Sequence, residues 1–60
     1  MDDGFYYIRH GSYNEIGPFP TAHRAYEEGV EGTFYSQDFI LQEWRGGNIV
    51  REWRDLSLFA

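Results

Sequence analysis

The adjacent glycines Gly46 and Gly47 separate two runs that are rich in aromatic and aliphatic residues. Residues 39–45 precede this pair, and residues 49–54 follow it. Two-residue hairpin turns need a positive φ, which glycine adopts without steric cost. The motif Glu-Trp-Arg ends both runs, a symmetry that suits paired strands. The pattern therefore predicts a β-hairpin over residues 39–54.

Counting outward from this turn gives the register of the hairpin. Three pairs are expected opposite each other: Trp44 with Ile49, Gln42 with Arg51, and Ile40 with Trp53. Side chains that face each other across a hairpin share one face of the sheet, so the four apolar members of these pairs are expected in the core. An alternative interpretation is a C-terminal helix capped by Asn48, because the apolar positions from Ile49 to Ala60 also fit a 3.6-residue period.

The N-terminal part predicts a second pair of strands. Residues 5–10 form an aromatic and aliphatic strand that stops at Gly11-Ser12, and residues 13–16 form the returning strand. Gly17-Pro18 is expected to end that strand, because proline lacks the N–H that a strand ladder needs. Phe19 would then lie on a bulge.

A short helix is expected after these strands. Thr21 is a suitable N-cap, and apolar residues follow it at helical spacing. Two i,i+4 pairs, His23 with Glu27 and Arg24 with Glu28, lie on its polar side. Gly29 and Gly32 are expected to end the helix after about two turns, and residues 32–38 to form a loop that carries Phe34 and Tyr35. The order strand, strand, helix, strand, strand predicts an α+β fold, in which a small antiparallel sheet packs against one short helix.

Sixty residues are enough for one domain, expected to span residues 1–60. The chain has no cysteine, so a disulfide framework is excluded and a reducing cytoplasm is the expected location. No apolar stretch reaches the roughly 18 residues that cross a bilayer, and the acidic N-terminus is unlike a signal peptide. The core must therefore come from the twelve aromatic residues.

Ten carboxylates and five arginines give the chain a net charge of −5. Phosphate repels such a chain, which argues against direct binding to nucleic acid or to an anionic membrane. A protein with a basic surface is the expected partner. Two alternatives stay open: the charge serves only to keep a small domain in solution, or the protein imitates DNA in the cleft of a nucleic-acid-binding enzyme.

The aromatic residues exceed what the predicted core needs. The core is expected to contain Tyr6, Ile8, Tyr26, Ile40, Trp44, Ile49 and Trp53. The remaining aromatic residues either cover the edges of a thin core or form an exposed patch of the kind that is enriched at interfaces. On the second interpretation, the expected partner-binding residues are Phe5, Tyr7, Tyr13 and Phe19, together with the carboxylate of Glu15.

The N-terminal half of the chain resembles the start of GYF and bacterial GYF-like domains. The resemblance rests on Phe5-Tyr6-Tyr7, followed by Gly17-Pro18-Phe19 and then by a short helix. Positions that are similar to the closing segment of the bacterial group are Leu41, Trp44, Gly47, Trp53 and Leu56. The chain departs from the family at three places. It has Phe5 where the family favours tryptophan, and the charged Arg24 and Glu27 where the family has apolar residues. Gly32-Thr33-Phe34 stands nearest to the Gly-Tyr-Phe triplet of the family. The resemblance implies an adaptor that binds proline-rich peptides through an aromatic patch containing Tyr7 and Phe19. A short acidic chain of this kind also resembles phage-encoded accessory proteins, which inhibit larger host enzymes.

Catalytic and cofactor chemistry find little support in the sequence. His10 and His23 are the only imidazole bases, and neither lies in a recognisable catalytic motif. His23, Glu27 and Glu28 could meet a metal through helical spacing, but such a set is usually a solvated helix face. Lysine is absent, and so is a glycine-rich phosphate loop. We therefore expect a non-enzymatic protein-binding module without metal or cofactor, which acts as a modulator or inhibitor of a larger protein.

Overall fold

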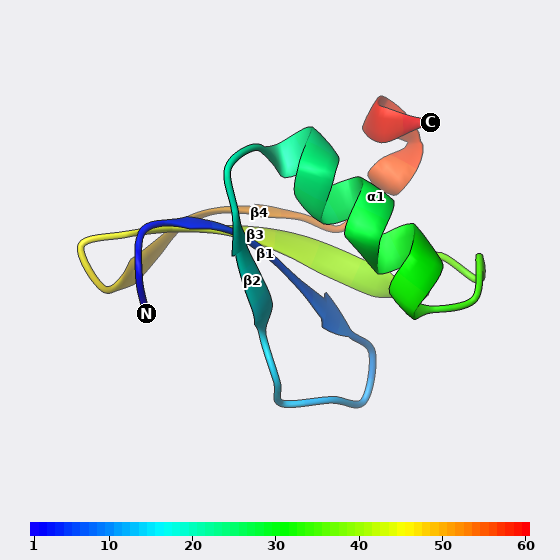
Figure 1. The fold of residues 1–60 in the computed structure, drawn as a ribbon, viewed down its shortest axis with the longest axis horizontal. Coiled ribbons are helices and arrows are strands. Elements are labelled where there is room, and N and C mark those ends of the chain that lie inside the picture. The colour runs from blue at the N-terminus through cyan, green and yellow to red at the C-terminus, as the bar shows by residue number, and fades with distance from the viewer.

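The computed structural model describes residues 1–60 as a four-stranded antiparallel sheet with one α-helix packed against it (Figure 1). The elements are β1 (Gly4–Arg9), β2 (Ile16–Phe19), α1 (Ala22–Gly32), β3 (Phe39–Arg45), β4 (Asn48–Trp53) and a final 3-10 turn, η1 (Leu56–Phe59). The strands lie in the order β2-β1-β3-β4. The α+β prediction, with the order β-β-α-β-β, is confirmed.

Strand β2 lies later in the chain than the sequence predicts. The expected strand over residues 13–16 is wrong, because pairing with β1 begins only at Ile16 and continues through Gly17-Pro18 to Phe19. Phe5 pairs with Phe19 and Tyr7 with Ile16, which leaves one extra residue in β2 as a bulge. A proline is tolerated here because β2 is an edge strand, whose outer N–H groups need no partner. The Gly17-Pro18 peptide bond is cis.

Helix α1 begins as predicted, but it is longer than expected. The side-chain oxygen of Thr21 accepts a hydrogen bond from the Arg24 N–H at 3.1 Å, which confirms the N-cap. Gly29 lies inside the eleven-residue helix, so the prediction that it ends α1 is wrong, whereas Gly32 is the last helical residue as predicted. The helix therefore has about three turns instead of the expected two. An added Cβ at Gly29 would lie 2.5 Å from the ring of Phe39. This glycine therefore allows the helix to approach the sheet closely.

The C-terminal hairpin is confirmed, but its register shifts. Gly46 and Gly47 form the turn with φ of 59° and 79°, and Trp44 pairs with Ile49. The next pair is Glu43 with Arg51, so Val50 is an extra residue in a bulge. Beyond the bulge Gln42 pairs with Glu52 and Leu41 with Trp53, and the predicted partners of Gln42 and Ile40 are wrong. The alternative C-terminal helix does not form, because β4 occupies its first half.

The core lies between α1 and the face of the sheet that carries the odd-numbered residues of β1 and β3. It contains Tyr7, Ala25, Tyr26, Phe39, Leu41 and Leu56, and Phe5, Phe19, Val30, Trp53 and Phe59 pack around it. Tyr26 is in the core as predicted, and Trp53 reaches it because the bulge turns that side chain toward α1. The placement of Ile8, Ile40, Trp44 and Ile49 in the core is wrong, because these residues lie on the opposite face.

Candidate protein-binding surface

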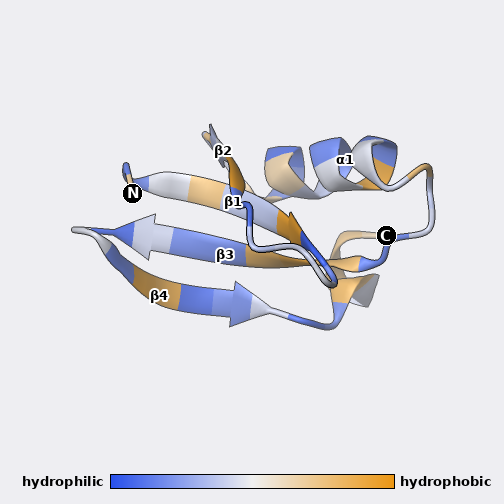
Figure 2. Ribbon diagram, turned by 90° about the horizontal axis from the view of Figure 1, so that it is seen from below, coloured by the Kyte–Doolittle hydropathy of each residue, from blue (hydrophilic) through white to orange (hydrophobic).

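The sheet face that points away from α1 carries a set of large side chains that no helix covers. The strand register places seven side chains on this uncovered face: Tyr6, Ile8, Ile40, Gln42, Trp44, Ile49 and Glu52. Figure 2 shows β1, β3 and β4 side by side, with the apolar stretch of β3 at its start and that of β4 near the turn. The uncovered face therefore has two apolar ends and a polar middle.

The middle of the uncovered face is rigid. Tyr6 is 3% exposed and Gln42 is 6% exposed, although no element packs over them. The Trp44 and Tyr6 rings pack edge to face, with their centroids 6.3 Å apart. The Trp44 Nε1–H donates a hydrogen bond to the Gln42 Oε1 at 3.1 Å. Gly17 of β2 closes the other side, since an added Cβ there would lie 2.8 Å from the Tyr6 ring. Neighbouring side chains thus fix the orientation of Trp44.

The apolar ends of this face reach the solvent. Ile49 is 45% exposed beside Trp44. At the other end Ile8 and Ile40 pair across β1 and β3 and line a shallow hollow of about 200 Å³, together with Arg9 and Arg54. Aromatic and aliphatic side chains in such positions are the usual anchors of a protein interface.

Three carboxylates gather near Tyr6 and form an acidic rim, which we define as Asp2, Asp3 and Glu15. The Tyr6 hydroxyl donates to the Asp2 carbonyl oxygen at 2.8 Å, and the Asp3 Oδ1 accepts from the Gly46 N–H at 2.9 Å. Burial raises the pKa of the Tyr6 phenol above its ordinary value of 10.0, and the charges of Asp2, Asp3 and Glu15 raise it further. No member of the rim forms an ion pair.

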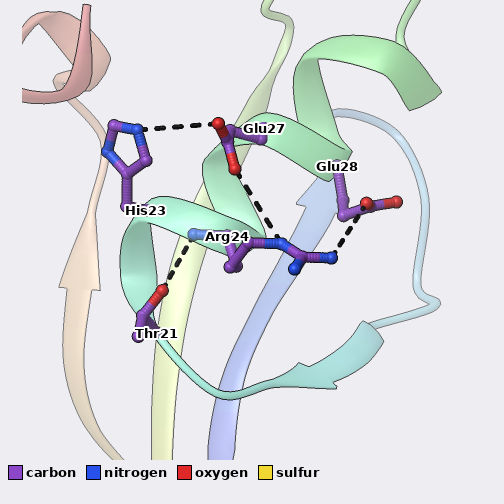
Figure 3. A network of polar contacts seen from close by, with 5 residues as sticks. All are labelled: Thr21, His23, Arg24, Glu27 and Glu28. Carbon is purple, nitrogen blue, oxygen red and sulfur yellow. Dashed lines mark hydrogen bonds and ion pairs between the residues drawn. The ribbon is translucent and has the colours of Figure 1, made fainter.

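The carboxylates of Glu27 and Glu28 on α1 differ from the acidic rim because both lie beside the Arg24 guanidinium (Figure 3). The Arg24 guanidinium lies 3.8 Å from a Glu27 oxygen and 3.5 Å from a Glu28 oxygen, and the His23 Nε2 lies 3.8 Å from the other Glu27 oxygen. Both predicted i,i+4 pairs are confirmed. No group of three or more histidine and carboxylate side chains is arranged to hold a metal ion.

The expected partner-binding residues are divided between core and surface. Tyr7 is 6% exposed and stacks on Phe19 with ring centroids 6.3 Å apart, so the prediction that both point outward is wrong. Phe5 is half-buried against Trp53. Tyr13 is 95% exposed in the β1–β2 loop, and Glu15 belongs to the acidic rim. The structure thus exposes Tyr13, leaves Phe5, Glu15 and Phe19 half-buried, and buries Tyr7.

The sequence carries one signal of the packing between α1 and the sheet. Gly29 and Gly32 are three residues apart on α1, and added Cβ atoms there would meet the side chains of Phe39 and Tyr7. Two glycines on one side of a helix indicate a close approach to large side chains. They mark the side of α1 that faces the sheet, but not which face of the sheet lies under it.

No helix in the structure combines the length and the apolar character that crossing a membrane requires. Comparison of the chain with protein-family models, with curated proteins and with solved structures finds no match.

Proposed function

We propose that this protein is a non-enzymatic binding module that docks its uncovered face on a basic surface of a larger cytoplasmic protein and so modulates or inhibits that protein. The observation that supports the proposal is a fixed tryptophan beside the exposed Ile49, next to three carboxylates without ion-pair partners. Trp44 would supply much of the affinity, because buried tryptophans dominate interface energetics. The acidic rim would speed encounter with a basic partner.

The size of the sheet indicates that the rim belongs to the interface. Three strands about 4.8 Å apart and about 20 Å long present a flat area of roughly 300 Å². A stable complex buries roughly 800 Å² on each partner. The partner must therefore also contact residues beside the sheet, which include the acidic rim and the exposed Tyr13 ring.

Two matched variants test the proposal. Ile49→Asp places a charge beside Trp44, and Leu58→Asp places the same charge at a 74% exposed site on η1. The wild-type protein, immobilised on beads, captures proteins from a lysate of its host cell, and each captured protein is quantified by mass spectrometry. We expect Ile49→Asp to lose the specific partner by at least tenfold and Leu58→Asp to retain it. Equal capture by both variants would exclude the uncovered face.

A second candidate function, binding of proline-rich peptides, rests on the stacked Tyr7 and Phe19 rings in the segment that resembles GYF domains. Phe19 is half-buried, so only part of this stack reaches a ligand. A proline-rich peptide titrated against the protein, with tryptophan fluorescence as the readout, separates the two proposals. If the protein binds proline-rich peptides, the peptide should change the tryptophan fluorescence saturably, and Phe19→Ala should abolish that change. If the uncovered face is the binding site instead, the peptide should leave the fluorescence unchanged.

A further inference from the structure

A polar groove lies between the β1–β2 loop and the loop that joins α1 to β3. It adjoins the hollow at one end of the uncovered face, with which it shares Arg9, His10 and Ser12. It encloses about 330 Å³, and its lining includes Arg9, His10, Ser12, Phe34, Ser36 and Asp38. Arg9 is the only arginine that forms neither an ion pair nor a cation–π contact nor a side-chain hydrogen bond. The chain has twice as many carboxylates as arginines, yet no carboxylate forms an ion pair with Arg9.

The groove also offers hydrogen-bond donors that the fold does not use. Ser12 Oγ accepts from the Asn14 N–H and Ser36 Oγ from the Asp38 N–H, but neither hydroxyl donates to an acceptor within the protein. The Asp38 carboxylate lies 3.6 Å from the His10 imidazole. The guanidinium of Arg9 and the two hydroxyls are the donor types that an incoming carboxylate requires.

Phe34 lines the groove, and Tyr35 follows it in the same loop. Both residues adopt a backbone conformation that lowers the stability of the fold. Phe34 is 89% exposed and Tyr35 is 73% exposed, with φ of 54° and 68°. Side chains other than glycine and asparagine are disfavoured in this left-handed region. The loop is nevertheless well fixed, because the Tyr35 N–H donates to the Val30 carbonyl at 2.8 Å and the Thr33 Oγ1–H to the Gly29 carbonyl at 2.9 Å. Stability alone would favour small polar residues at both positions.

We propose that this groove is a second interaction site, which binds an acidic peptide segment of a partner protein. A carboxylate of the segment pairs with Arg9 and accepts from Ser12 and Ser36, and a neighbouring apolar side chain packs on the Phe34 ring. The proposal goes beyond the function of the uncovered face, because this site has the opposite charge preference. The protein would then contact a basic surface through the uncovered face and an acidic segment through the groove between the two loops.

A capped hexapeptide of alternating glutamate and phenylalanine, titrated into the ¹⁵N-labelled protein, tests this proposal by NMR. We expect saturable shifts in residues 9–12 and 32–38, and no shifts from the peptide in which glutamine replaces glutamate. Arg9→Gln should weaken binding at least tenfold, whereas Arg24→Gln, on the helix, should leave it unchanged. Arg9 also lines the hollow of the uncovered face, but residues 32–38 and Arg24 lie outside that face. Shifts in residues 32–38 therefore distinguish this outcome from the proposed function.

Phe34→Asn distinguishes binding from a structural role. Asparagine tolerates a positive φ, so this variant should melt at the same temperature as the wild type or higher, while its affinity for the glutamate peptide falls at least fivefold. A lower melting temperature with unchanged affinity would show that Phe34 serves the fold. That outcome would overturn the proposal. So would the absence of saturable shifts, or binding by Arg9→Gln that equals binding by the wild type.

Discussion

Replacing Gly29 by alanine has two opposite effects on stability: it favours the helix, and it crowds the core. Alanine is favoured over glycine inside a helix by about 1 kcal/mol. At this position, however, the new Cβ would lie 2.5, 2.6 and 2.8 Å from three atoms of the Phe39 ring. That ring is 1% exposed and is held by Tyr7 and Tyr26, with centroids 5.6 and 6.0 Å away. Overpacking costs up to about 3 kcal/mol, so the expected net loss is about 1–2 kcal/mol of unfolding free energy.

Urea unfolding followed by circular dichroism measures this loss. A domain of this size has roughly 3–9 kcal/mol of stability, so the transition midpoint should fall clearly while its slope stays the same. The control is Phe39→Leu, because a smaller side chain makes room for the new methyl group. Gly29→Ala should therefore cost less in the Phe39→Leu background than in the wild type. If Gly29→Ala instead stabilises the wild-type protein, α1 does not approach the sheet this closely, and the packing argument fails.

Three further predictions concern burial and charge. Tyr7→Ala should cost about 3–5 kcal/mol and largely unfold the protein, whereas Tyr13→Ala, at a 95% exposed site, should leave the circular dichroism melting curve unchanged. The raised pKa of Tyr6 stabilises the fold below pH 10, so stability should decline as the pH rises above 10. In Tyr6→Phe that decline should be smaller in urea titrations at pH 9 to 12, and an equal decline would exclude Tyr6 as its source. Binding of the basic partner should weaken as salt is raised from 50 to 500 mM, and salt-independent affinity would remove the acidic rim from the interface.

Local chemistry made much of the fold predictable. The Thr21 cap, the Gly46-Gly47 turn and the order of elements follow from short-range rules that tertiary packing does not override. The sequence pattern misplaces β2 because Gly17-Pro18 is typical of a strand end, although an edge strand can contain a proline. Each of these features depends on a few neighbouring residues.

The side of the sheet that α1 covers could not be predicted in the same way. Strand β1 has Tyr6 and Ile8 on one face and Phe5 and Tyr7 on the other, so two-residue alternation favours neither. In β4 the extra residue Val50 changes the face of every later side chain, and no sequence signal marks a bulge. Of the predicted partner-binding residues, Tyr7 is therefore buried, Phe5, Glu15 and Phe19 are half-buried, and only Tyr13 is exposed.

The bulge at Val50 also affects how two molecules could meet. An uninterrupted outer strand offers its unused N–H and C=O groups to the same strand of another copy, and sheets can then grow from edge to edge. In β4 the bulge breaks the regular spacing of these groups, and the exposed Arg51 and Glu52 directly follow the break. On the opposite edge β2 has only four residues, and its Pro18 has no N–H to donate. With both edges closed to strand addition, the sheet can expose tryptophan and isoleucine on an open face without templating its own aggregation.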